Sequence, residues 1–172
     1  MTQRSFLNIN PENTNFLQTT KYTFVIPNLP FARYFCQNVN LPGVTSNEIE
    51  VPNPFASAYR HPTKMSFEAF TITFLVDEDL KVWEETFKWI VSLTRPESYS
   101  QYIKSINADA SPYQDGLLTI NTNANISNIR IKFRNVFPVS LGGIQFSTMN
   151  SADTTPTADV TFRYDIFDIE RL

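Results

Sequence analysis

The sequence predicts a mainly β fold: an antiparallel β-sandwich or barrel with one flanking helix over about residues 79–94. Three segments, 66–76, 128–134 and 160–167, alternate apolar and polar side chains with the period of two that is typical of half-buried strands. One further segment repeats apolar residues at helical spacing. An antiparallel sheet packed on a second sheet and on one helix buries all of these apolar faces.

The segment 66–76 has the clearest strand pattern in the chain. Phe70, Ile72 and Phe74 fall on one face at a spacing of two, and threonines occupy the face between them. In a sandwich, the apolar face of such a strand packs on the core. We therefore expect these three side chains to be buried.

The predicted helix, residues 79–94, follows the acidic run Asp77-Glu78-Asp79 and ends before Pro96. Carboxylates at a helix start suit the positive end of its dipole and cap free N–H groups; a cation site or a pair of catalytic acids is the alternative interpretation. The apolar stripe consists of Leu80, Trp83, Phe87, Ile90 and Val91. Trp89 lies off this stripe, which makes it a candidate for contact with another subunit.

Other segments are less regular. Residues 21–26 and 34–39 are rich in β-forming side chains and are predicted to be strands. Residues 52–64 carry three prolines and are predicted to form a long loop, a type of segment that is usually functional in a compact domain. In the polar stretch 107–127, residues 117–120 are either a short strand or a docking patch.

We predict an N-terminal arm and one β domain with two loop insertions. The boundaries are 1–20 for the arm, 21–172 for the domain, and 52–64 and 107–127 for the insertions. The arm is polar but carries apolar anchors, among them Phe6 and Phe16. It packs either on its own domain or on a neighbouring subunit, and the sequence leaves both open.

The composition argues against an enzyme and against a nucleic-acid-binding protein. The formal net charge is -3 and the pI is about 5.1, whereas binding to phosphates rests on lysine and arginine. The chain has one histidine, His61, and one cysteine, Cys36, and neither has an obvious catalytic partner. Cys36 is expected in a strand as a buried small side chain. We predict no catalytic residue, no cofactor, no metal, no signal peptide and no membrane association.

Arg130, Lys132 and Arg134 form a basic strip on one strand face. Three cations are few for binding to nucleic acid. We expect them on a solvated face or paired with acids.

The order of short motifs resembles the tail-tube family of contractile bacteriophages from about residue 21 to the C-terminus. Early in the chain these motifs are Leu41-Pro42-Gly43, the strand Phe70-Thr71-Ile72-Thr73-Phe74, Val76-Asp77-Glu78 and Phe87-x-Trp89. Later ones are Ile129-x-Ile131, Phe137-Pro138, Gly143-Ile144-Gln145 and Val160-Thr161-Phe162-x-Tyr164-Asp165. No single motif is specific, and only their order carries the resemblance.

The resemblance implies a tail-tube-like β fold and a structural role in the virion. Proteins of this family form hexameric rings that stack into a tube, and the sheets of the subunits join into the wall of a channel through which DNA is ejected. The partners implied are copies of this chain in the same and adjacent rings, together with sheath and baseplate proteins. DNA would pass without specific binding. Such a protein is made in the host cytoplasm, and the type VI secretion tube is a related assembly.

Two other functions remain open. A baseplate tube-initiator, hub-adaptor or tail-terminator protein would have the same fold. A monomeric β-barrel that binds a small ligand belongs to a different class. For the assembly role, the candidate inter-subunit contacts are Phe6, Phe16, Phe55, Tyr59, Arg60, Trp89 and Arg163.

Overall fold

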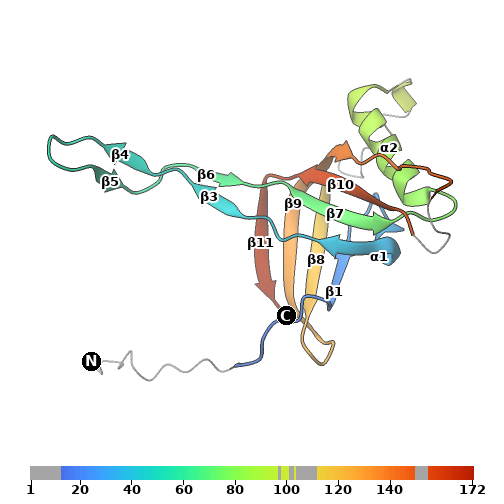
Figure 1. The fold of residues 1–172 in the computed structure, drawn as a ribbon, viewed down its shortest axis with the longest axis horizontal. Helices are drawn as coiled ribbons and strands as arrows, with labels where there is room; N and C mark the ends of the chain where they lie inside the picture. The colour runs from blue at the N-terminus through green and yellow to red at the C-terminus, as the bar shows by residue number, and fades with distance from the viewer. Residues whose placement is uncertain (1–12, 97, 101–102, 104–111, 150–154) are drawn as a thin grey trace.

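The computed structural model shows two layers of antiparallel strands, one helix at their end, and a two-stranded ribbon that projects from them (Figure 1). It describes residues 13–96, 98–100, 103, 112–149 and 155–172. The elements are β1 (Tyr22–Val25), α1 (Ala32–Phe35), β2 (Cys36–Val39), β3 (Val44–Ser46), β4 (Ile49–Val51), β5 (Ala58–Arg60), β6 (Met65–Phe67), β7 (Phe70–Leu75), α2 (Lys81–Thr94), β8 (Gln114–Asn121), β9 (Ser127–Leu141), β10 (Thr157–Arg163) and β11 (Ile166–Arg171).

Strand β9 belongs to both layers. Its first half pairs with β8 on one side and β11 on the other, and its last residues pair with β10. The strand order is β1-β8-β9-β10-β7-β2, with β11 beside β9. In the part of the chain that the structure describes, β1 and β2 end this order without pairing with each other, so the predicted sandwich is confirmed and the barrel is not closed.

A bulge at Asn135 lets β9 cross between the layers. Asn135 has φ 56°, in the left-handed region, and both Arg134 and Asn135 are exposed between the buried residues Phe133 and Val136. The Asn135 side-chain amide donates to Asp165 Oδ2 at 2.6 Å. The extra residue restores the inward direction of the following side chains. As a result, the strand continues beyond the predicted segment 128–134, through Phe137-Pro138 to Leu141.

The core lies between the layers and is built mainly of aromatic rings. Phe70, Ile72 and Phe74 are fully buried, which confirms the predicted strand face. The Phe70 ring stacks on Phe133 and Phe162, with centroids 4.7 and 5.1 Å away. These contacts join the two layers through one side chain.

Helix α2 is confirmed, but the predicted packing face is wrong. Its buried residues are Val82, Thr86, Trp89 and Ser92. Trp89 is only 4% exposed and its ring lies 6.1 Å from that of Phe162, so it belongs to the core and is not available for contact with another subunit. The hydroxyls of Thr86 and Ser92 donate to the helix's own carbonyls, which lets these small polar residues face the core. Phe87, assigned to the stripe from sequence, is half exposed and stacks on Trp83.

The acidic run before α2 is an N-terminal cap. Leu80 is the residue at the cap position, and its side chain makes no capping bond. Instead, Asp77 Oδ2 accepts the backbone N–H of Lys81 at 3.2 Å, and Asp79 pairs with the Lys81 ammonium at 2.7 Å. Capping is therefore confirmed for Asp77, whereas Asp79 forms an ion pair instead.

Four segments differ from their predicted form. The predicted strand 34–39 begins as α1, and the final strand is divided into β10 and β11. The segment 107–127 was predicted as a loop insertion with a short strand or a docking patch at 117–120; the strand is confirmed and is longer, as β8, which pairs with both β1 and β9. The predicted loop 52–64 contains β5 and belongs to the projecting ribbon.

The burial of Phe74 predicts a large loss of stability when its ring is removed. Phe74→Ala should lower the free energy of unfolding by about 3–5 kcal/mol, the usual cost of truncating a core aromatic. Phe55→Ala is the matched control, because Phe55 is fully exposed. Chemical denaturation of both variants measures the difference. Equal midpoints for Phe74→Ala and the parent protein would contradict the assigned core.

Candidate assembly interfaces

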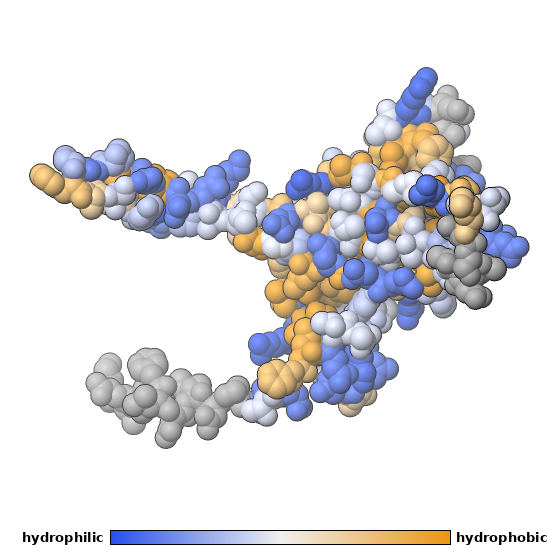
Figure 2. All heavy atoms as spheres, viewed as in Figure 1, coloured by the Kyte–Doolittle hydropathy of each residue, from blue (hydrophilic) through white to orange (hydrophobic). Residues whose placement is uncertain are grey.

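A β-ribbon, residues 44–67, projects from the sandwich as two successive strand pairs (Figure 1). β3 pairs with β6 near its base, and β4 pairs with β5 near its tip. Phe55 at the turn is fully exposed, and Ile49, Tyr59 and Met65 are also exposed. Figure 2 shows apolar atoms at the far end of the ribbon, well away from the sandwich. A two-stranded ribbon without a second layer is marginal in water, so this one favours burial against a partner.

The base of the ribbon is fixed to the sandwich. The Phe67 ring packs on Tyr164 and Phe167, with centroids 5.8 and 5.7 Å away. The Arg163 guanidinium donates to the Phe67 carbonyl at 3.3 Å. The ribbon is therefore anchored at one end by aromatic packing, and its apolar tip is presented to solvent.

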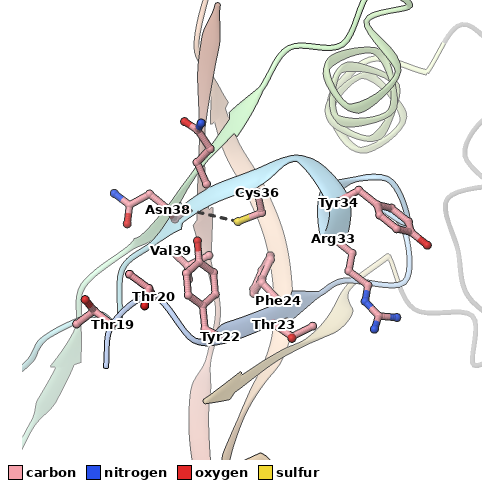
Figure 3. Close-up of a pocket in the computed structure, with 11 residues that line it drawn as sticks. Thr19, Thr20, Tyr22, Thr23, Phe24, Arg33, Tyr34, Cys36, Asn38 and Val39 are labelled. Carbon is pink, nitrogen blue, oxygen red and sulfur yellow. Dashed lines mark hydrogen bonds between the residues drawn. The ribbon is translucent and has the colours of Figure 1, made fainter. Parts of the chain in front are cut away.

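A second feature is the seam between the end strands β1 and β2. Here the surface has a hollow of about 650 Å³ (Figure 3). Its lining is Thr19, Thr20, Tyr22, Thr23, Phe24, Arg33, Tyr34, Cys36, Gln37, Asn38 and Val39. Because β1 pairs only with β8 and β2 only with β7 among the described strands, each presents an unpaired edge at this seam.

Tyr22 and Cys36 are neighbours across the seam. The Cys36 thiol donates to the Asn38 carbonyl at 3.6 Å. Burial, with the neighbouring thiol, raises the pKa of Tyr22 to about 12. Burial also raises the pKa of Cys36, which keeps it a thiol at neutral pH. This environment agrees with the prediction that Cys36 is not a nucleophile.

The outer face of β9 carries the basic strip in a charge-balanced setting. Lys132 pairs with Asp115 at 2.8 Å, and Arg134 pairs with Asp168 at 2.5 Å. Arg130 stands opposite Glu170 in the register of β9 and β11. The sequence predicted that these cations are solvated or paired with acids, and Lys132 and Arg134 do form ion pairs.

The outer face of β7 and β10 is polar and carries no such strip. Thr71 and Thr161 face each other with hydroxyl oxygens 3.3 Å apart. Thr73 donates its hydroxyl to Asp159 at 2.6 Å. This face offers hydroxyls and a carboxylate to whatever lies beside it.

The predicted contact residues are not gathered at one place. Phe55, Tyr59 and Arg60 lie together on the ribbon, and Arg163 supports its base. Phe16 is exposed in the arm, Trp89 is buried, and Phe6 lies outside the described residues. Sequence reasoning missed the seam, because its residues come from two short strands, β1 and β2, and from α1, and no pattern in the sequence indicates that these segments lie side by side.

The described residues hold no group of three or more His, Cys, Asp or Glu side chains that could bind a metal. Nor does any helix among them have the length and apolarity needed to span a membrane. What the geometry does present is unpaired strand edges and an apolar ribbon. This fold and these surfaces define a mainly β domain whose described part exposes strand edges and an apolar ribbon.

Comparison with known proteins identifies the family. Residues 10–170 match the family model of the phage tail tube protein, and the chain belongs to this family. It is 22% identical over 165 residues to the tail tube terminator protein of Enterobacteria phage T4, covering 91% of this chain and 90% of that protein. The family and this relative are structural tail components and not enzymes, as the sequence predicted.

Solved structures of contractile injection systems share the fold. The tube-terminating cap of the anti-feeding prophage aligns with a TM-score of 0.63 at 12% identity, over 98% of this chain and 100% of that one. The sheath-tube complex of the PVC extracellular contractile injection system, in its extended state, aligns with a TM-score of 0.61 at 12% identity, over 92% and 94%. At these identities the alignments show the fold alone.

The environment of Cys36 predicts that its thiol is dispensable for assembly. Cys36→Ser should leave assembly intact and reduce stability modestly, because the side chain is only partly buried. Thermal unfolding and electron microscopy of the variant measure these two properties. A Cys36→Ser protein that is fully folded yet unable to assemble would reveal a role for the thiol.

Proposed function

We propose that this chain is a ring-forming subunit of a contractile phage tail tube. The observation that carries the proposal is the exposed apolar ribbon on a domain of the tail-tube family. The ribbon cannot be buried on its own domain while it projects as it does, so its apolar residues favour contact with a neighbouring copy. A contact between different surfaces of identical subunits generates a ring when the rotation closes. Six subunits per ring is the number that the family resemblance implies.

A second candidate, a tube terminator, has equal support. The 22% identity extends over 90% of the phage T4 tube terminator protein. A tube subunit and a terminator form similar rings but differ in stacking: a tube ring binds another ring on both faces, whereas a terminator ring binds the tube on one face and stops it. A baseplate initiator is the corresponding protein at the other end.

The proposed channel carries DNA without binding it. A wall rich in hydroxyls and carboxylates lacks the cations on which attraction to phosphate depends. The outer face of β7 and β10, with Thr71, Thr73, Asp159 and Thr161, suits such a wall, although it also carries the cation Arg163, whose guanidinium donates to a backbone carbonyl. The cations on β9 are partly neutralised by their acidic partners, so they are a weaker source of attraction to DNA.

The remaining parts of the proposal concern partners and location. The subunit acts in the virion tail beside sheath and baseplate proteins, and is made in the host cytoplasm. The arm over residues 1–20 packs on a neighbouring subunit, which the exposure of Phe16 and Leu17 supports.

Purified protein tests the ring directly. Light scattering coupled to size exclusion should give the mass of a closed oligomer, and negative-stain microscopy should show rings. Rods made of stacked rings support a tube subunit, whereas single rings that block the growth of tubes support a terminator. A monodisperse monomer, both alone and when mixed with preformed tail tubes, would refute both.

Shortening the ribbon should abolish assembly and spare the fold. Residues 48–63 are replaced by Asn-Gly, which favours the tight turn of a two-residue hairpin, so that β3 still pairs with β6. The core lies elsewhere, so thermal unfolding should change little while rings are lost. Normal rings from the shortened protein would show that the ribbon is not an assembly contact.

A further inference from the structure

We propose that the seam between β1 and β2 is the receptor for the ribbon tip of a second copy of this chain. The inference rests on the proposed assembly function and adds to it the site that receives the ribbon. It joins two surfaces of the same molecule that are otherwise unexplained: an apolar projection and a hollow between unpaired strand edges.

The ribbon tip is shaped for insertion. Phe55 is fully exposed at the turn, and Pro52 and Pro54 stiffen the chain just before it. The Ser57 hydroxyl donates to the Glu50 carboxylate, which ties the two strands beside the turn. A tip restrained in this way loses little conformational entropy on docking. An aromatic side chain on a stiff turn is also the kind of residue that anchors protein interfaces.

The seam is suited to receive an aromatic side chain flanked by strand. Tyr22 contributes an aromatic ring to the hollow, Phe24 lies in the core beneath it, and Tyr34 is exposed at its edge; the volume of about 650 Å³ accommodates several side chains (Figure 3). The edges of β1 and β2 leave backbone donors and acceptors without a strand partner in the described chain. A strand of a second copy seated here would cover these edges, as in other cases of strand addition.

Charge also favours this pairing. Arg33 is the one charged side chain in the lining, and it makes no ion pair with any described residue. On the ribbon, the exposed carboxylates of Glu48 and Glu50 lie close to the tip. A guanidinium at the rim of the hollow can therefore meet a carboxylate of the incoming ribbon, and its plane can stack on the Phe55 ring.

The pairing has a consequence for assembly. The tip and the seam are different surfaces, so a single tip-to-seam contact is heterologous and leaves one tip and one seam free, unless two copies exchange ribbons reciprocally. Each copy gives one ribbon and receives one ribbon. Such a contact continues from copy to copy until a ring closes, or it links one ring to the next.

The single cysteine of the chain provides a direct test, because Cys36 lines the hollow. Asn53→Cys, Ala56→Cys and Ala58→Cys, which lie beside the anchors and leave Phe55, Ser57 and Tyr59 in place, are made one at a time, assembled, and oxidised mildly. A disulfide requires the two Cα atoms to approach within about 4.4–6.8 Å. At least one ribbon variant should yield disulfide-linked multimers on a non-reducing gel. The same variant combined with Cys36→Ser should yield none beyond ribbon-to-ribbon dimers.

Controls separate this inference from the assembly function itself. Ala124→Cys, in the exposed turn between β8 and β9, should not cross-link to Cys36. If particles assemble but no ribbon cysteine bonds to Cys36, the seam is not the receptor, and the ring proposal stands. If no variant and no parent protein assembles, the assembly function fails and this inference fails with it.

A charge reversal gives an independent readout. Arg33→Glu should raise the protein concentration needed for assembly, and adding Glu50→Arg in the same chain should lower it again. The unfolding midpoint of each variant checks that the fold is retained. Unchanged assembly of a folded Arg33→Glu protein would contradict the proposed docking.

Discussion

The Phe70 ring contacts Phe24, Phe133, Phe162 and Tyr164, and through them it ties the two strand layers to one another. Each such aromatic pair contributes about 0.5–1.5 kcal/mol beyond the burial of its area. Because the partners come from both layers, the cluster fixes the register in which the layers meet. The bulge of β9 at Asn135 is what allows this single strand to pair in both layers around the cluster.

The aromatic core is fully packed by residues of the sandwich, and the ribbon tip is not part of it. Its aromatic base at Phe67 reaches the edge of the cluster through Tyr164 and Phe167, but the tip extends beyond any contact with the sandwich. Apolar residues such as Phe55 and Tyr59 are therefore available to a neighbour. Within the described chain, β1 and β2 also do not pair with each other, at the position where a barrel would close. In this account, assembly follows from a fold that buries its core completely and leaves the ribbon tip and the outer edges of β1 and β2 without a partner in the described chain.

The sequence predicts most of the sandwich, because a half-buried strand alternates apolar residues that face the core with polar residues that face solvent. Phe70, Ile72 and Phe74 illustrate this pattern. The position of helix α2 could also be predicted, from its length and from the acidic residues at its start. The packing face of α2 could not be predicted, since Thr86 and Ser92 face the core by satisfying their hydroxyls within the helix. The tip of the ribbon, residues 52–64, has no buried side, so it carries no alternation and was predicted to be a loop. The candidate site was predicted only where Phe55, Tyr59 and Arg60 stood out as exposed anchors.

The central claim is that this chain functions as a member of a closed ring in a phage tail. A cryo-electron microscopy map of the assembled particle tests it most directly. The account predicts copies of this fold arranged around an axis, with each ribbon buried against a neighbouring copy. Isolated subunits without strand or ribbon contacts to a copy of this chain or to a related tube protein would contradict it.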